Sequence, residues 1–226
     1  MLKRLALLCL FLSAADSLPL MMTFDKSEID LQGTDYASGN FAFNKSPEIG
    51  PFFEMLRHVY PITTVIETGT FEGSTTAFFA RTFEEVHTID ISPQYSKTAQ
   101  QRLTSLSNIK FHLGSSEKVL AQILPTISEK FVLFYLDAHW NEYWPLLDEL
   151  EAISKTHHNH CIVVIDDVKV PGRSDIPFDA YKGHECSFEY AKEKIEKLFD
   201  GYSMHYLIPS NPLMRAKLVI IPKTGR

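Results

Sequence analysis

Carboxylate side chains follow four short apolar runs of this sequence. Glu67 follows "TTVI", Asp90 follows "VHTI", Asp137 follows "FVLFYL", and Asp166 and Asp167 follow "CIVVI". A buried carboxylate is costly unless it is paired or hydrogen bonded. If the four runs are strands of one sheet, their acids gather at one edge of it, and this coincidence predicts a shared polar ligand or a cation.

The loop after Glu67 contains two residues without side chains, Gly69 and Gly73, within "VIETGTFEG". Gly69 permits a tight turn, and Gly73 lets the following helix pack closely, with its free N–H groups facing a ligand. The chain lacks the G-x-G-x-x-G dinucleotide pattern and a Walker lysine, so phosphate binding is the weaker interpretation. Glu67 suits an ammonium group instead, and Asp90 is placed to accept both hydroxyls of a ribose.

Strands and helices alternate along the chain, as the position of these acids requires. The apolar runs are short and rich in β-branched residues, which is typical of strands buried on both faces. We predict these strands at 63–69, 86–91, 109–114, 131–138 and 161–168, and helices at 74–83, 93–106, 115–124 and 143–156. The alternation indicates a parallel sheet of βαβ units. A further helix at 187–199 precedes two runs, 202–208 and 217–223, that can pair antiparallel.

At these motifs the chain resembles the class I S-adenosylmethionine-dependent methyltransferases, over residues 60–223. "VIETGTFEG" is similar to their first motif, and "VHTIDIS" to the acidic motif that holds the ribose. The resemblance implies an α/β fold: a Rossmann-like three-layer α/β/α arrangement with a mostly parallel seven-stranded sheet and a C-terminal antiparallel hairpin. It also implies S-adenosyl-L-methionine as cofactor, bound by Glu67, Gly69, Thr70, Gly73, Asp90, Ile91, Gly114, Ser115, Ser116 and Asp137.

The stretch "YLDAHWNEY", with the later "VVIDDV", is similar to the metal-dependent O-methyltransferases of the catechol type. By that resemblance Asp137, Asp166 and Asp167 bind one divalent cation, and such a set of carboxylates suits Mg²⁺. The family has a lysine base three residues after the first Asp, where this chain has Trp140. His139 is the nearest titratable substitute, so the predicted catalytic residues are His139 and Asp137.

Composition and the N-terminus restrict the class of partner. The 226 residues include 22 Lys plus Arg and 28 Asp plus Glu, and the net charge of −6 gives no excess of positive charge that would attract nucleic acid.

The N-terminal sequence "MLKR" followed by "LALLCLFL" has the pattern of a secretory signal and is too short to span a membrane. It predicts export, unless translation starts at Met21 or Met22. We therefore divide the chain into a leader (1–15), an N-terminal arm (16–58) and a cofactor-binding domain (59–226), with a small-molecule acceptor as partner.

Two further features leave alternatives open. The long connection 170–188 carries Arg173, Asp179, Tyr181 and His184, and it is either a lid facing the acceptor or a surface excursion. Cys161 and Cys186 either form a disulfide or are core residues, and we favour the core. The sequence is compatible with three functions: a methyltransferase, a non-catalytic nucleoside-binding domain, or an exported metal-dependent hydrolase or sugar-modifying enzyme.

Overall fold

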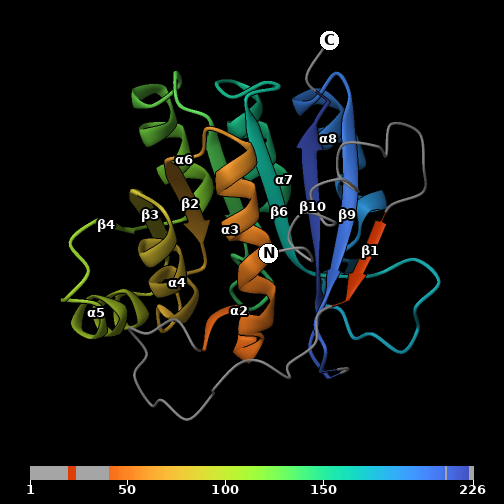
Figure 1. Ribbon diagram of the computed structural model, residues 1–226, viewed down its shortest axis with the longest axis horizontal. Helices are drawn as coiled ribbons and strands as arrows, with labels where there is room; N and C mark the ends of the chain where they lie inside the picture. The colour runs from red at the N-terminus through yellow and green to blue at the C-terminus, as the bar shows by residue number, and fades with distance from the viewer. Residues whose placement is uncertain (1–19, 24–40, 212, 224–226) are drawn as a thin grey trace.

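A computed structural model describes residues 20–23, 41–211 and 213–223, and the predicted leader lies outside them. Eight strands form one sheet in the order β1-β9-β10-β6-β5-β2-β3-β4, and β10 alone runs antiparallel to its neighbours (Figure 1). The strands are β1 (Leu20–Thr23), β2 (Thr64–Thr68), β3 (Glu85–Asp90), β4 (Ile109–Leu113), β5 (Val132–Leu136), β6 (Cys161–Val168), β9 (Tyr202–Ile208) and β10 (Ala216–Pro222). A small hairpin, β7 (Ala180–Tyr181) with β8 (His184–Glu185), lies outside this sheet.

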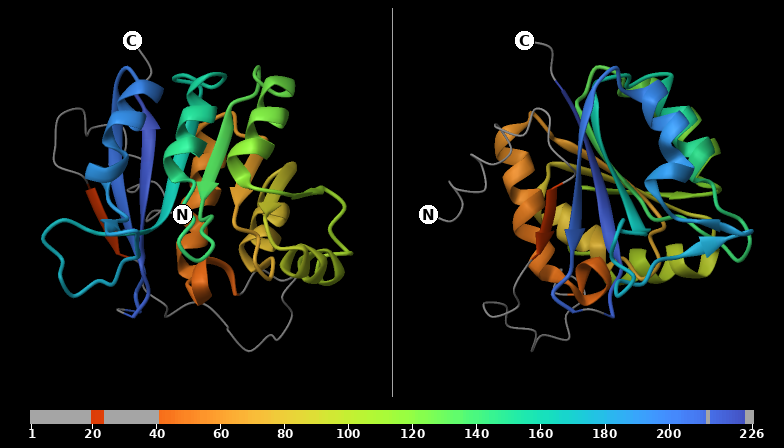
Figure 2. Two further views of the ribbon diagram at one scale, coloured as in Figure 1. Left: turned by 180° about the vertical axis from the view of Figure 1, so that it is seen from behind. Right: turned by 90° about the vertical axis from the view of Figure 1, so that its right-hand side faces the viewer.

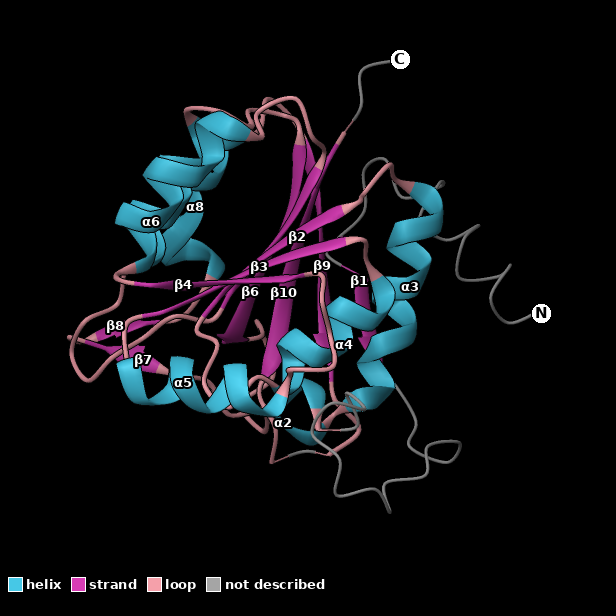
Figure 3. Ribbon diagram, turned by 90° about the vertical axis from the view of Figure 1, so that its left-hand side faces the viewer, coloured by secondary structure: helices cyan, strands magenta, loops and turns pink. Residues whose placement is uncertain are grey.

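Helices cover both faces of the sheet, as Figures 2 and 3 show. One face carries α6 (Ser116–Ile123), α7 (Leu146–Ser154) and α8 (Phe188–Leu198), and the other carries α3 (Gly50–Val59) and α4 (Ser74–Thr82). Two hydrophobic cores result because neighbouring residues of a strand point to opposite faces: Ile66 joins the first core and Val65 the second. The remaining helices are α5 (Pro93–Arg102), the turn α2 (Ala42–Lys45) and two 3₁₀ turns, Pro47–Ile49 and Leu124–Thr126.

The sheet has a switch point between β2 and β5. From β2 the chain moves outward through β3 to β4, then returns to the other side of β2 for β5 and β6. Ligands of open α/β sheets bind outside the carboxyl ends of the strands at such a point. The acidic residues predicted to form a site lie at or just beyond the ends of β2, β3, β5 and β6.

The predicted α/β fold is confirmed, including the C-terminal antiparallel pair β9 and β10. The sheet has one strand more than predicted: β1 pairs in parallel with β9, from Leu20 opposite His205 to Thr23 opposite Ile208. Part of the predicted arm is therefore a sheet edge, and the arm also contains nearly all of α3. Both cysteines are free and buried, as expected of core residues. No helix within the described ranges is long and apolar enough to span a bilayer.

Candidate active site

Two adjoining cavities lie at the carboxyl ends of the central strands. The smaller, of about 30 Å³, and the larger, of about 380 Å³, share Gly69, Asp90, His139 and Trp140 in their walls. Of the ten residues predicted to bind the cofactor, six line the smaller cavity: Gly69, Asp90, Ile91, Gly114, Ser115 and Ser116. Asp137 lines the larger one. The cavities thus collect seven predicted residues from four separate loops.

Gly69 lets the loop after β2 lie directly against the end of β5. Its φ of +84° is in the left-handed region, and a Cβ atom there would lie 2.5 Å from the carbonyl oxygen of Asp137. The Gly69 N–H donates to the carbonyl of Ile89, 2.9 Å away at the end of β3. The glycine therefore holds three strand ends close together, as the sequence predicts for a tight turn.

We expect Gly69→Ala to lower the free energy of unfolding by about 3 kcal/mol or more, because the methyl group meets a backbone carbonyl. Gly172→Ala is a matched control: Gly172 has a similar φ of +74°, but nothing lies within 4 Å of its added Cβ. That variant should cost only the backbone strain of about 1 kcal/mol. Urea denaturation of both variants measures the difference, and equal losses would contradict the close contact at Gly69.

Asp90 is held in the wall of both cavities by two backbone N–H groups. Its Oδ1 accepts from Ser92 N at 2.7 Å, and its Oδ2 accepts from Phe71 N at 2.8 Å. Burial raises the pKa of the Asp90 carboxyl group. Each oxygen keeps a lone pair for a further donor. The carboxylate is therefore fixed in place and still able to accept two ligand hydroxyls.

Three of the predicted cofactor residues, Glu67, Thr70 and Gly73, line neither cavity. The Glu67 carboxylate is buried below the loop, where it accepts from the hydroxyls of Thr76 and of Thr88, the latter at 2.6 Å. Thr70 shares a 2.6 Å hydrogen bond with the same Thr88 hydroxyl. A Cβ on Gly73 would meet Ala99 of α5 and Leu103 just after it, so this glycine serves helix packing, as predicted. These positions support the loop from beneath.

Burial raises the pKa of Glu67 from 4.5 to about 7, which makes stability depend on pH. Between these values the unfolded chain has lost the proton and the folded chain keeps it, so stability falls as pH rises, by about 3 kcal/mol. Glu67→Gln should remove this loss and reduce the dependence of the urea midpoint on pH between pH 5 and about 8. Glu149 and Asp167, whose pKa values burial raises to about 7 and about 8, should contribute to the slope that remains. An unaltered slope in Glu67→Gln would contradict the burial of an ionisable Glu67.

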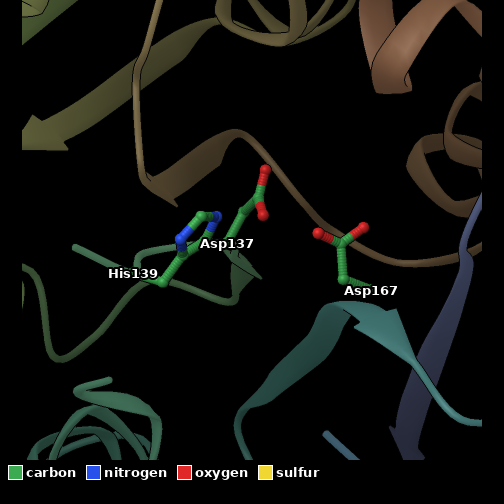
Figure 4. A group of neighbouring side chains, drawn as sticks. All are labelled: Asp137, His139 and Asp167. Atoms are coloured by element: carbon green, nitrogen blue, oxygen red, sulfur yellow. The ribbon is translucent and has the colours of Figure 1, made fainter. Parts of the chain in front are cut away.

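Asp137, His139 and Asp167 form the cluster drawn in Figure 4. One possible ligand atom from each lies within 4.8 Å of the others, and all three residues line the larger cavity. The two carboxylates face each other, and the imidazole lies beside Asp137. Burial together with the neighbouring Asp166 raises the pKa of Asp167 to about 8, and the same causes raise the pKa of Asp137 well above its usual range. His139 is exposed, and the partial desolvation of its ring lowers its pKa.

Asp166, also predicted as a metal ligand, is not part of the group formed by Asp137, His139 and Asp167. Its Oδ1 forms a 2.7 Å ion pair with Lys217 of β10, with both side chains 1% exposed, and its Oδ2 accepts from the Tyr135 hydroxyl. The side chains of Asp166 and Asp167 diverge because Asp167 has a φ of +60° and adjacent strand residues point to opposite faces. Asp167 therefore lines the larger cavity, whereas Asp166 is paired with the lysine and lines only an adjoining cavity of about 10 Å³.

Comparison with known proteins supports the same fold. A family model of a methyltransferase domain matches residues 66–168, which include the first motif, Asp90, Asp137 and the Asp166–Asp167 pair. The O-methyltransferase TomG of Streptomyces achromogenes, solved with S-adenosylmethionine, matches with a TM-score of 0.61 at 18% identity, over 86% of this chain and 91% of its own. The chain has the class I methyltransferase fold. The resemblance inferred from the motifs is therefore confirmed.

A second solved methyltransferase agrees with this assignment of the fold. The O-methyltransferase of Bacillus cereus, in complex with S-adenosylhomocysteine, matches with a TM-score of 0.59 at 19% identity, over 82% of this chain and 86% of its own. No curated protein matches the sequence. The likeness to solved structures thus gives the methyltransferase fold, and the site has to be judged from its own residues.

The cleft contains residues that the sequence did not point to. Arg215, from the connection between β9 and β10, lines the larger cavity and pairs with Asp179 Oδ1 at 2.7 Å. Phe71 and Tyr95 also line it, with ring centroids 4.6 Å apart. The only signal for Arg215 was its place in a hairpin turn, because a surface arginine in a loop has no distinctive spacing.

The sequence left open whether the connection 170–188 is a lid facing the acceptor or a surface excursion, and its four named residues lie in both kinds of surroundings. The Tyr181 ring stacks on His139 with centroids 5.1 Å apart, and Tyr181 donates to Asp179 at 2.7 Å. Arg173 instead pairs with Asp175 on the surface, and His184 packs on Tyr190. Tyr181 and Asp179 therefore contact residues that line the larger cavity, namely His139 and Arg215.

Proposed function

We propose that this protein is an S-adenosylmethionine-dependent methyltransferase that methylates an oxygen of a small molecule with the help of a divalent cation. The observation that carries the proposal is the joined pair of cavities. The smaller has walls suited to the edges of a ribose and a base but cannot enclose them, so the nucleoside would extend into the larger cavity, which contains the Asp137, His139 and Asp167 cluster. Two O-methyltransferases of the same fold were solved with the donor or its demethylated product, which supports the choice of cofactor.

The residues present fit the cofactor. Asp90 would accept the ribose hydroxyls, and Ile91, which is 42% exposed, would lie against the base. Gly114, Ser115 and Ser116 would close the adenine side of the smaller cavity, where the start of α6 presents backbone N–H groups. When bound there, S-adenosylmethionine would supply the methyl group. The protein's part is to hold that group at the larger cavity, above Asp137.

The residues also fit a divalent cation. Asp167 is 6% exposed, and its Oδ1 has no hydrogen-bond partner among the described residues. Arg215 lies 3.7 Å from Asp167 Oδ2 and offsets part of the negative charge. A dication would neutralise the rest of the charge of the two neighbouring carboxylates. Asp137 and Asp167 would hold the ion, which when bound would lower the pKa of an acceptor hydroxyl. This keeps two of the three ligands that the sequence predicts and leaves out Asp166.

Other side chains of the larger cavity would position the acceptor. Trp140 and Phe71 are 43% and 55% exposed, so their rings can cover the apolar part of a small molecule and exclude water. The lowered pKa of His139 leaves its imidazole neutral near pH 7. It can then take the acceptor's proton, as the sequence predicts, or donate a lone pair to the cation.

Calorimetry with S-adenosylhomocysteine, with and without a divalent cation, tests the proposal. Binding followed by methyl transfer to hydroxyl compounds in a broad acceptor panel is the expected result. Binding without turnover across that panel would point to a non-catalytic nucleoside-binding domain. No binding in either condition would overturn the proposal and leave a metal-dependent hydrolase or sugar-modifying enzyme.

A further inference from the structure

The cation site of the proposed function is not a set of three carboxylates. Asp137 comes just after β5, His139 follows two residues later, and Asp167 comes from β6. These three are the group of possible metal ligands that the described residues bring within 4.8 Å of one another. Figure 4 shows the carboxylates facing each other with the imidazole beside Asp137. The third protein donor is therefore a nitrogen.

Both oxygens of Asp166 already accept hydrogen bonds, and one belongs to a buried ion pair, which disfavours this residue as a third carboxylate ligand. Its oxygens are engaged by Lys217 at 2.7 Å, by the Tyr135 hydroxyl and by the backbone N–H of Asp167. Turning this side chain into the cavity would leave the lysine buried and unpaired, which costs about 3–5 kcal/mol. The site is thus restricted to two carboxylates and one imidazole.

The imidazole is held in position by its surroundings. Tyr181 of β7 stacks on the His139 ring at 5.1 Å with an interplanar angle of 27°. The Tyr181 hydroxyl donates to Asp179, and Asp179 in turn pairs with Arg215. On the other side, Trp140 exchanges two backbone hydrogen bonds with Tyr143, which fixes the loop after His139. Ligands oriented by such neighbours bind metal more tightly than freely rotating ones.

We infer that Asp137, His139 and Asp167 bind a first-row transition-metal dication, of the Mn²⁺ to Zn²⁺ series, in preference to Mg²⁺. Imidazole nitrogen suits these ions, whereas Mg²⁺ prefers oxygen donors throughout its shell. The two carboxylates neutralise the charge of a dication, and the open larger cavity leaves room for water or an acceptor oxygen. The inference rests on the cation site of the proposed function and names the ion class that this site selects.

The test uses the metal-free full chain with Co²⁺ and Mg²⁺ as probes. Calorimetry and the visible absorption of Co²⁺ should show one site that binds Co²⁺ at least about 100-fold more tightly than Mg²⁺. His139→Ala should weaken Co²⁺ by about 10-fold or more and change Mg²⁺ affinity much less. His139→Asp should bring the two affinities together by restoring an all-oxygen set. His184→Ala, on the exposed hairpin strand β8, is the matched histidine control and should change neither.

Equal or tighter binding of Mg²⁺ by the unaltered chain, or unchanged Co²⁺ affinity in His139→Ala, would overturn the inference. Nitrogen coupling in the electron spin-echo spectrum of bound Mn²⁺ gives a second reading on the unaltered protein, so the conclusion does not depend on a variant that folds. S-adenosylhomocysteine binding measured on the same samples separates the two proposals. Retained product binding without selective metal binding refutes the ion class alone, and lost product binding refutes the methyltransferase itself.

Discussion

Asp90→Ala should lower the affinity for S-adenosylhomocysteine by about 100-fold, because two charge-assisted hydrogen bonds to the ribose are worth about 3 kcal/mol together. The carboxylate is held by Ser92 N and Phe71 N and lines both cavities, so no neighbouring acid can replace it without moving the loop. Asp90→Asn keeps the shape and one acceptor oxygen, and should lose about 10-fold. Calorimetric titration of each variant gives these ratios.

Glu193→Ala is the matched control for the loss of one carboxylate. Its side chain is 83% exposed on α8 and pairs with Lys197 in the next turn. Its affinity for the product should equal that of the unaltered chain. If Asp90→Ala is folded and binds the product undiminished, the nucleoside is not held at this cleft and the cofactor assignment is wrong.

Lys217→Met should lower the free energy of unfolding by about 3–5 kcal/mol, the largest effect on stability that we expect from one side chain. Lys217 and Asp166 form a 2.7 Å ion pair with both side chains 1% exposed, so removing the cation leaves a carboxylate buried without its counter-charge. The Tyr135 hydroxyl bond satisfies an oxygen but supplies no charge. The midpoint of urea denaturation at constant pH measures the loss.

The double variant Lys217→Met with Asp166→Asn should recover more than half of that loss, since the asparagine oxygen still accepts from Tyr135 and no charge remains. Lys197→Met, where the lysine is 53% exposed, is the matched control and should leave the midpoint unchanged. A small loss in Lys217→Met with no recovery in the double variant would show that Asp166 is compensated by another group, and would return it to the list of possible metal ligands.

The pattern of apolar residues along the sequence predicted most of the fold, because it shows directly which residues are buried. Strands such as 161–168 are buried on both faces and read as unbroken apolar runs, and the structure has a strand at those residues. The strand β1 had no such signal. Its sequence "LMMT" has three apolar residues and a threonine, and a run of four is too short to distinguish a strand from a helix or a loop. These residues become a strand because the edge of β9 is available to pair.

The sequence also predicted only part of the candidate site. Acids at strand ends predicted a shared polar site, and Asp90, Asp137 and Asp167 do meet at one cleft. Glu67 fits the same pattern, yet its carboxylate is satisfied by Thr76 and Thr88 below the loop. Whether a strand-end acid faces the cavity depends on which donors the neighbouring elements offer, and these donors are distant in sequence.

The amino-acid sequence by itself determined the α/β architecture, the glycine loop after the first central strand and the gathering of acids at one edge of the sheet. These follow from hydrophobic period, backbone freedom and the parallel direction of strands, which are local properties. Only the tertiary structure decided that Asp166 is paired with Lys217, 51 residues away, and that His139 lies close to Asp137 and Asp167. A buried charge selects its partner by proximity in the folded chain, and that proximity is created by the order of the strands.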